Sequence, residues 1–277
     1  SVPLTPPHRQ AREEDFLFRK NFPLIFLAIF PEMKHNRSSH CKSIHVPQKR
    51  IQKIMNSFDI IGPVMVGPSS SHTAGAVKIG SISHKLLGVP VRKADIFFHG
   101  SFLATGRGHG TDRALVAGLL GFPMDDPRIS DSFRYAGEAG MEFNMSGIDL
   151  GDVHPNSVKL LLDGEDGQHI EIVAASVGGG SIRITEIDGL PTDFSGDYPT
   201  LVVHNVDQPG HVTEITSMLG HKSINIATMK LNRSSKGGRA VIVLECDQEI
   251  PPDAIRWLAH LEGILKVTYL SLKEDVR

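Results

Sequence analysis

The chain has 277 residues, enough for two compact domains, and its 40% hydrophobic and 22% charged content is ordinary for a soluble globular protein. A formal net charge of −2 gives no reason to expect nucleic acid or an anionic membrane surface as a partner, and no stretch reaches the ~18 apolar residues of a membrane span. The two cysteines, Cys41 and Cys246, fit a reducing cytoplasm and are too few to hold a zinc ribbon or an iron–sulfur cluster.

Residues 1–54 differ from the rest of the chain. They combine prolines, basic residues and histidines without a sustained helical or strand period. We expect an upstream extension that is largely disordered. A partner-binding arm built on the short apolar run at residues 22–30 is the alternative.

Residues 66–80 read VGPSSSHTAGAVKIG and carry the strongest indication of function. The Gly-Pro pair stops the preceding structure, and residues 74–87 are helix formers. The start of a helix has free backbone N–H groups and the positive end of the helix dipole, so it attracts carboxylate or phosphate. Ordinary N-capping by Ser or Thr is the simpler reading. The candidate ligand-binding residues here are Ser69, Ser70, Ser71, His72 and Thr73.

Mixed helix and strand signals follow from Met55 to about residue 190. We expect a strand at 94–99, a glycine-rich loop at 100–110, and a helix at 111–120 with Thr111 as its cap. Alternating apolar runs at 157–162 and 170–176 predict a hairpin, and 181–187 a further strand. Residues 188–199 are rich in turn formers, so we expect an interdomain linker there, with residues 191–199 outside both domains.

Two further polar clusters lie in this first domain. The segment GRGHGTDR at 106–113 combines glycines, which let a backbone approach a ligand, with acid–base and orienting groups. The segment DVHPN at 152–156 is a polar cluster held by a proline. Capping of the helix and a simple turn are the structural alternatives. The candidates are Gly108, His109, Thr111, Asp112, His154 and Asn156.

Residues 200–273 have a regular order of elements. We expect strands at 200–205, 224–232, 239–246 and 264–272, with helices at 210–220 and 252–261. This βαββαβ order predicts a ferredoxin-like sandwich, with two helices on one face of an antiparallel sheet. The predicted fold class is therefore α+β, a mixed domain at 55–190 followed by a ferredoxin-like domain at 200–273.

The ordered motifs SSSHTAGAVKIG, HGSFLATGRGHGTDRALVAGLLG, DVHPNS and SVGGGSIRI resemble those of the iron–sulfur-dependent L-serine dehydratases. From Met55 onward, the order and length resemble the separate beta chain of the two-chain form. The resemblance implies conversion of L-serine to pyruvate and ammonia with a 4Fe–4S cluster held by an alpha chain. An open iron of that cluster would act as a Lewis acid. It further implies that His72, His109 and the nearby hydroxyls contribute to the serine pocket.

The C-terminal unit resembles an ACT regulatory domain, on the strength of the segments DQPGH at 207–211 and SINIA at 223–227. The resemblance implies a site for a small amino acid, L-serine being our first choice, and association of copies through ACT domains. Asn205 and Asp207 depart from the His and Asn of serine-binding versions. The implied ligand residues are Asn205, Asp207, Gly210, His211 and Asn225.

Two other functions remain open at this point. A purely regulatory amino-acid-binding module is one, but such a sensor has no need of the loop at 69–73. A hydrolase with a Ser–His pair is the other. We rank it last, because adjacent Ser71 and His72 are not expected to meet in productive geometry.

Overall fold

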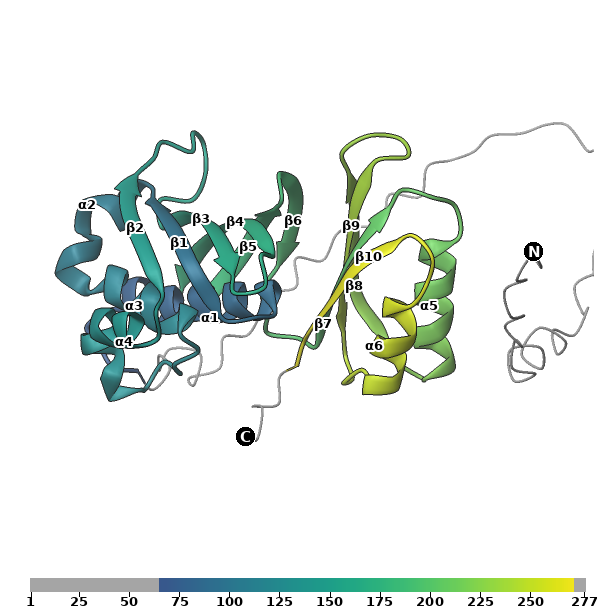
Figure 1. Ribbon diagram of the computed structural model, residues 1–277, viewed down its shortest axis with the longest axis horizontal. Coiled ribbons are helices and arrows are strands. Elements are labelled where there is room, and N and C mark those ends of the chain that lie inside the picture. The colour runs from purple at the N-terminus through teal and green to yellow at the C-terminus, as the bar shows by residue number, and fades with distance from the viewer. Residues whose placement is uncertain (1–64, 272–277) are drawn as a thin grey trace, which may run out of the picture. The chain divides into compact units, whose positions relative to one another are not determined.

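The computed structural model describes residues 65–271, and its strands form two sheets, one of six strands and one of four (Figure 1). The expectations for residues 1–54 lie outside the described residues. A mixed domain is followed by a βαββαβ unit, so the predicted α+β class is confirmed.

The first sheet has the strand order β2-β1-β3-β4-β5-β6, in which β1 and β2 are parallel and the other neighbouring pairs antiparallel. Its strands are β1 Val91–Phe98, β2 Glu142–Gly147, β3 Ser157–Gly164, β4 His169–Gly178, β5 Ser181–Ile187 and β6 Leu190–Phe194. The predicted hairpin (β3–β4) and the strand at 181–187 (β5) are confirmed. Their buried apolar side chains alternate as half-covered strands require, for example Val158, Leu160 and Leu162.

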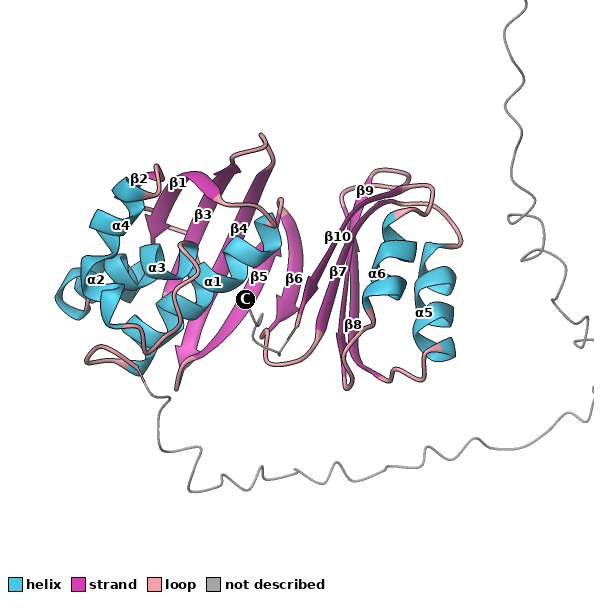
Figure 2. Ribbon diagram, turned by 60° about the horizontal axis from the view of Figure 1, so that its bottom comes forward, coloured by secondary structure: helices cyan, strands magenta, loops and turns pink. Residues whose placement is uncertain are grey.

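The helices of this domain are α1 Gly75–Leu87, α2 Gly100–His109, α3 Thr111–Leu119 and α4 Ser132–Glu138, with short turns at Ser70–Ala74 and Pro127–Asp131. Helix α1 packs on β3, β4 and β5 and crosses α3 (Figure 2). The crossing is close, because a Cβ on Gly118 would lie 2.1 Å from the Val77 carbonyl oxygen, and one on Gly80 would lie 2.4 Å from that of Leu115. Two glycines therefore set the position of α1 on its domain.

Strand β6 occupies part of the segment that we expected to be a linker, so that prediction is wrong for residues 190–194. Asp188 and Gly189 have φ of 51° and 75°, and positive φ at two successive turn residues is what a tight hairpin needs. The chain therefore folds back after β5 and adds β6 as an edge strand, where Pro191 is tolerated because no outer neighbour requires its N–H.

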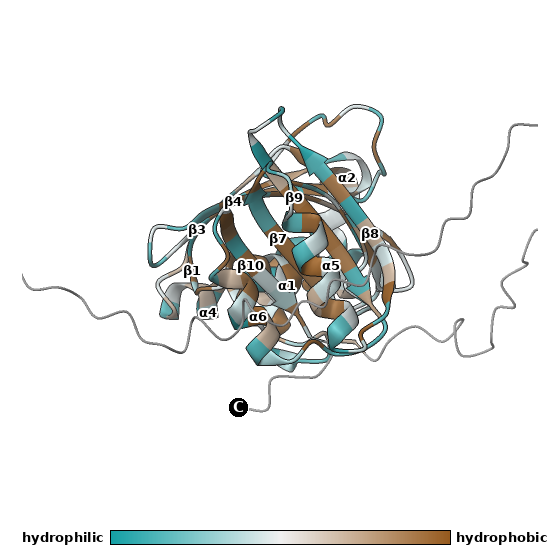
Figure 3. Ribbon diagram, turned by 90° about the vertical axis from the view of Figure 1, so that its right-hand side faces the viewer, coloured by the Kyte–Doolittle hydropathy of each residue, from teal (hydrophilic) through white to brown (hydrophobic). Residues whose placement is uncertain are grey.

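The second sheet has the order β10-β7-β9-β8, antiparallel throughout. Its elements are β7 Thr200–Val206, α5 His211–His221, β8 Ile226–Arg233, β9 Arg239–Cys246, α6 Pro252–Ala259 and β10 Ile264–Leu270, which confirms the predicted order. Leu201, Val203 and Ile242 belong to the core beneath α5 and α6. Figure 3 shows hydrophobic stretches along the central strands β7 and β9.

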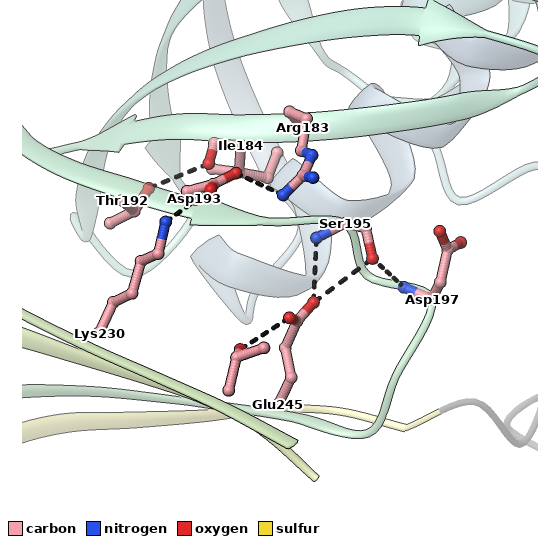
Figure 4. A network of polar contacts seen from close by, with 9 residues as sticks. Arg183, Ile184, Thr192, Asp193, Ser195, Asp197, Lys230 and Glu245 are labelled. Carbon is pink, nitrogen blue, oxygen red and sulfur yellow. Dashed lines mark hydrogen bonds and ion pairs between the residues drawn. The ribbon is translucent and has the colours of Figure 1, made fainter. Parts of the chain in front are cut away.

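The opposite face of this sheet meets the first domain. Alternate residues of its strands, including Val202, Val241 and Leu270, join the core cluster of the first domain. A polar network borders this contact (Figure 4). Glu245, only 6% exposed, accepts hydrogen bonds from the Ser195 N–H at 3.1 Å and the Thr228 hydroxyl at 2.8 Å. Lys230 reaches Asp193 of β6 at 2.5 Å.

Helices long and apolar enough to cross a membrane are absent from the described residues.

Candidate functional site

The Ser/His/Thr run forms the first turn of the helix that continues as α1. Residues Ser70–Ala74 make a π-helical turn, and the Ser69 hydroxyl caps it by accepting the His72 N–H at 3.1 Å. The Thr73 N–H donates to the Ser69 carbonyl at 2.8 Å. Ser69 thus has the ordinary capping role. Single π-turns within helices occur frequently at functional sites, and this one turns His72 away from the core that begins at Thr73.

His72 lies at the centre of a cluster of hydroxyl groups. Its Nδ1 is 3.2 Å from the Ser71 Oγ, and its Nε2 is 3.1 Å from the Thr105 Oγ1 and 3.3 Å from the Ser101 Oγ. The contact between neighbours Ser71 and His72 contradicts our expectation that they would not meet. The π-turn brings the hydroxyl back over the adjacent ring, a geometry that sequence adjacency alone does not suggest.

These contacts favour one tautomer of His72. The Thr105 hydroxyl donates its proton to the Ser101 carbonyl at 2.9 Å, so its oxygen is left to accept from the imidazole. His72 Nε2 is then the protonated nitrogen, and Nδ1 accepts from the Ser71 hydroxyl. A neutral His72 therefore presents an N–H toward α2 and orients the Ser71 oxygen.

His109 lies beside His72, with ring centroids 4.9 Å apart. Its Nδ1 is 3.0 Å from the Thr105 carbonyl, which only accepts, so Nδ1 carries the proton and the lone pair of neutral His109 is on Nε2. Burial and the nearby His109 lower the pKa of His72. The structure thus brings together two predicted residues as neighbouring imidazoles, with a neutral His72 favoured near pH 7.

The glycine-rich segment 100–110 is a helix, α2, and not the predicted loop. Its first N–H groups are satisfied from outside, because the Ser101 N–H donates to the Pro155 carbonyl at 2.7 Å. Gly100 has φ of 52°, and a Cβ there would lie 2.6 Å from that carbonyl oxygen. Phe102 is buried beneath α2 at 1% exposure. Tertiary contacts therefore outweigh the low helix propensity of the glycines.

Ser101 and Thr105 are functional candidates that the sequence reasoning missed. They are four residues apart on α2, which puts both on one face of the helix toward His72. The spacing of two hydroxyls within HGSFLATG was the available signal, and it becomes visible only once that segment is read as helix.

His154 and Asn156 shape the loop that supports α2. The exposed His154 accepts the Asn156 N–H through Nδ1 at 3.1 Å, and the Asn156 side chain donates to the Ser176 carbonyl at 3.4 Å. The hydrogen bonds described for them stay within this loop, β3 and β4. Their link to His72 is indirect, through Pro155 and Ser101.

Gly108, Thr111 and Asp112 do not join the hydroxyl cluster. Gly108 lies in the last turn of α2, and a Cβ there would meet open space. The N-cap of α3 is Gly110, with φ of 69°, so the predicted Thr111 cap is wrong. The Thr111 side chain is buried against Gly106 instead. Asp112 lines a separate cavity of about 360 Å³ beside Phe102, Leu103 and Phe133.

The residues implied as amino-acid ligands in the second domain divide into two groups. The first group, Asn205, Asp207, Gly210 and His211, follows the end of β7. Asn205 pairs with Ala240 on β9, whereas Asn225 comes just before Ile226, which pairs with Cys246. Ala240 and Cys246 are six residues apart on β9, a distance of ~20 Å at ~3.3 Å per residue. A single copy of the chain therefore does not bring Asn225 to the other four.

The two groups also differ in how their polar atoms are satisfied. The Asn205 Oδ1 and both ring nitrogens of His211 are buried without a hydrogen-bond partner in residues 65–271. Asp207 is engaged by the Arg233 guanidinium at 2.7 Å and the Gly237 N–H at 3.1 Å, contacts that lower its pKa. The Asn225 side chain donates to Asp247 at 2.5 Å. Asn205 and His211 are thus the members with unused hydrogen-bonding capacity.

The chain is a two-domain α+β protein, in which a cluster of hydroxyls and imidazoles at a helix start is followed by a ferredoxin-like domain. The family model described as "Serine dehydratase beta chain" matches residues 56–142. The chain is 40% identical over 220 residues to a probable L-serine dehydratase beta chain of Bacillus subtilis (strain 168), covering 79% of this chain and 99% of that protein. It therefore belongs to the serine dehydratase beta-chain family.

A second curated beta chain agrees in extent with this assignment. The L-serine dehydratase beta chain of Peptoniphilus asaccharolyticus is 37% identical over 218 residues, covering 78% of this chain and 98% of that one. Among solved structures, the ACT domain of a GTP pyrophosphokinase from Chlorobium tepidum is matched over 26% of this chain and 95% of that one, at 22% identity and a TM-score of 0.22.

Proposed function

We propose that this chain supplies part of the serine-binding pocket of a two-chain L-serine dehydratase, which converts L-serine to pyruvate and ammonia. The observation that carries the proposal is the joining of His72 and His109 with the hydroxyls of Ser71, Ser101 and Thr105. Membership of the beta-chain family supports the reaction class.

Each group has a definite chemical capacity in this reaction. The hydroxyls of the cluster, with the positive end of the helix dipole at the helix start, would bind the serine carboxylate. Neutral His109 has its lone pair on Nε2 and is the group suited to take up a proton. The elimination moves the α-proton to a base and the hydroxyl out as water. Hydrolysis of the resulting aminoacrylate gives pyruvate and ammonia.

The described residues do not fit a 4Fe–4S cluster. Burial raises the pKa of the Cys246 thiol to about 11, so this cysteine is not a thiolate ligand near neutral pH. Residues 65–271 contain no group of three or more His, Cys, Asp or Glu side chains placed to hold a metal ion. In our proposal the alpha chain holds the cluster, which would supply a Lewis-acid iron. The chain described here would bind and orient the serine and move protons.

Co-expression with a cysteine-bearing alpha chain, followed by anaerobic iron analysis and a serine deamination assay, tests this division of roles. We expect the purified chain alone to contain no cluster and to leave L-serine unchanged, and the pair to contain iron and produce pyruvate. An iron-rich, active preparation of this chain by itself would contradict the proposal.

We also propose that the C-terminal domain binds a small amino acid, with L-serine as first candidate, between two copies of the chain. The supporting observation is that Asn205 and His211 have unused buried polar atoms, while Asn225 of the same copy is ~20 Å away by strand register. We expect millimolar L-serine to raise the melting temperature and the dimer fraction together, and Asn225→Ala to weaken both effects. Binding by a strictly monomeric chain would contradict this arrangement.

A purely regulatory role for the whole chain is the second candidate function. The unpaired buried polar atoms of the C-terminal domain favour this role. The imidazole cluster of the first domain does not support it, because an amino-acid sensor has no need of such a cluster. The two roles are separated by the effect of His72 variants on turnover.

A further inference from the structure

A second polar cavity, distinct from both proposed sites, lies where the two domains meet. It has a volume of about 370 Å³ and is lined by His169, Asp188 and Leu190 from the first domain and by His204, Arg239 and Lys266 from the second. We infer that this cavity is a binding site for a small oxyanion, a carboxylate or phosphate group, that bridges the two domains.

Neither of the two cationic side chains that line the cavity, Lys266 and Arg239, has an ion-pair partner among residues 65–271, although Asp188 and Asp166 act on Lys266 from a longer distance. Within residues 65–271 the Lys266 ammonium donates only to neutral acceptors, the Leu87 carbonyl at 2.8 Å and the Gln168 side-chain oxygen at 2.9 Å. The Arg239 guanidinium has neither a hydrogen bond nor an ion pair with any described residue. A half-buried ammonium and a free guanidinium facing one cavity favour an anion there, since planar guanidinium binds carboxylate and phosphate in two-point geometry.

His204 supplies further unused polar atoms. Both of its ring nitrogens are buried and without a hydrogen-bond partner in residues 65–271. Burial lowers the pKa of His204, the nearby Asp188 carboxylate opposes this, and Lys266 and Arg239 lower it further, so the net direction is down. A neutral imidazole next to two cations has one N–H to donate, and a bound oxyanion would accept it. Buried polar groups are normally paired, so the His204 ring indicates a missing partner.

The carboxylates around the cavity are engaged only in part, since one oxygen of Asp188 has no hydrogen bond among the described residues. Asp163 contacts His169 at 2.7 Å. Asp188 accepts the Glu171 N–H at 2.9 Å through one oxygen, and its other oxygen is 3.6 Å from the His204 Nε2. With Asp188 as the only carboxylate among the lining residues that the structure describes, the two cations leave the cavity positive. The carboxylate of Asp188 would also suit the ammonium group of a zwitterion.

This cavity is separate from the sites proposed above. Lys266 contacts the carbonyl at the C-terminal end of α1, whereas His72 lies at the N-terminal end of the same helix. The thirteen residues of α1 span ~20 Å at ~1.5 Å per residue. His204 and Asn205 are adjacent on β7, so their side chains point to opposite faces of the sheet. The inference therefore stands whether or not the chain takes part in serine dehydration.

Thermal unfolding of the full chain, at constant ionic strength in sodium chloride, tests the site. The probes are inorganic phosphate, pyruvate and L-serine, each from micromolar to millimolar concentration. We expect at least one to raise the melting temperature, because a ligand bound only by the folded state stabilises it by mass action. Stabilisation by phosphate and pyruvate assigns a simple oxyanion. Stabilisation by L-serine assigns to this cavity a zwitterion held also by Asp188 only where it persists in Asn225→Ala and is lost in Arg239→Gln.

Two arginine variants make the test specific. Arg239→Gln removes an exposed guanidinium from the cavity, and we expect it to weaken probe binding in isothermal calorimetry about tenfold or more. Arg256→Gln, on α6 at the other face of the sheet, is the matched control and should bind like the parent chain. The Asn225→Ala variant should also keep cavity binding, which separates it from the proposed amino-acid site. The inference is overturned if no probe shifts the melting temperature, or if Arg239→Gln binds as tightly as Arg256→Gln.

Discussion

Substituting Gly118 by alanine should destabilise the chain, although helix propensity alone predicts the opposite. Gly118 lies within α3 where this helix crosses α1. An added Cβ would lie 2.1 Å from the Val77 carbonyl oxygen and 2.8 Å from the Ser81 nitrogen. Both are backbone atoms of a packed helix, so they cannot rotate away, and the helices would have to separate by about 1 Å.

The magnitude follows from two opposing effects. Replacing glycine by alanine inside a helix gains about 1 kcal/mol of folding free energy. Overpacking a close-packed contact costs about 1–3 kcal/mol or more, and here the clash is with backbone. Because the backbone cannot give way, we take the upper end of this cost, about 3 kcal/mol, and expect a net loss of about 2 kcal/mol in the free energy of unfolding. Gly220→Ala is the control, because a Cβ on this α5 residue meets no atom within 4 Å, and it should stabilise by about 0.5–1 kcal/mol.

Urea unfolding followed by circular dichroism measures both variants against the parent chain. A lower midpoint for Gly118→Ala and a higher one for Gly220→Ala, with similar slopes, are the expected results. If Gly118→Ala stabilises the chain as much as Gly220→Ala does, the close crossing of α1 and α3 is wrong. The position of the His72 turn at the start of α1 would then lose its structural basis.

Three further predictions follow from the polar contacts. In thermal melts, Glu245→Ala should lower the free energy of unfolding by about 2 kcal/mol, since Ser195 and Thr228 lose a buried acceptor. Glu138→Ala, at an exposed position, is the control and should be nearly neutral. Thr105→Val should lower kcat/KM of the two-chain enzyme about tenfold, because the valine leaves the His72 Nε2–H without its 3.1 Å partner. Thr105→Ser keeps the hydroxyl and should retain the activity. Equal activity of the two variants would contradict the assigned tautomer. In NMR titrations the His72 ring resonances should give a pKa below the ordinary value of 6.5. The free energy of unfolding should therefore fall as the pH is lowered from about 6.5 toward the folded-state pKa of His72. An NMR midpoint at or above 6.5 would contradict this.

The strands of both sheets that alternate apolar and polar residues could be predicted from the sequence. The β3–β4 hairpin and the βαββαβ order of the second domain are of this kind, because one face of each strand is buried. Helix α2 could not be predicted in this way, since the carbonyl of Pro155 and the burial of Phe102 stabilise a glycine-rich helix from outside. Strand β6 was missed because Asp188-Gly189 was taken as part of a linker and not as a hairpin turn.

Part of the candidate site could likewise be expected from the sequence, and part could not. The meeting of His72 with His109 was expected from the family resemblance, which put both in one pocket. Ser101 and Thr105 could not be found, because their contacts with His72 exist only once α2 packs against the π-turn. The separation of Asn225 from Asn205 depends on strand register, which the linear motif does not contain.

The role of His72 in the reconstituted two-chain enzyme is the most direct test of the proposed function. His72→Ala should lower kcat/KM for L-serine by about 10²-fold or more, the usual effect of losing a positioned acid–base group. The iron content and the association of the two chains should stay unchanged, since the described contacts of the His72 side chain lie within its own domain. Near-normal turnover by His72→Ala would contradict the account and would favour a purely regulatory chain.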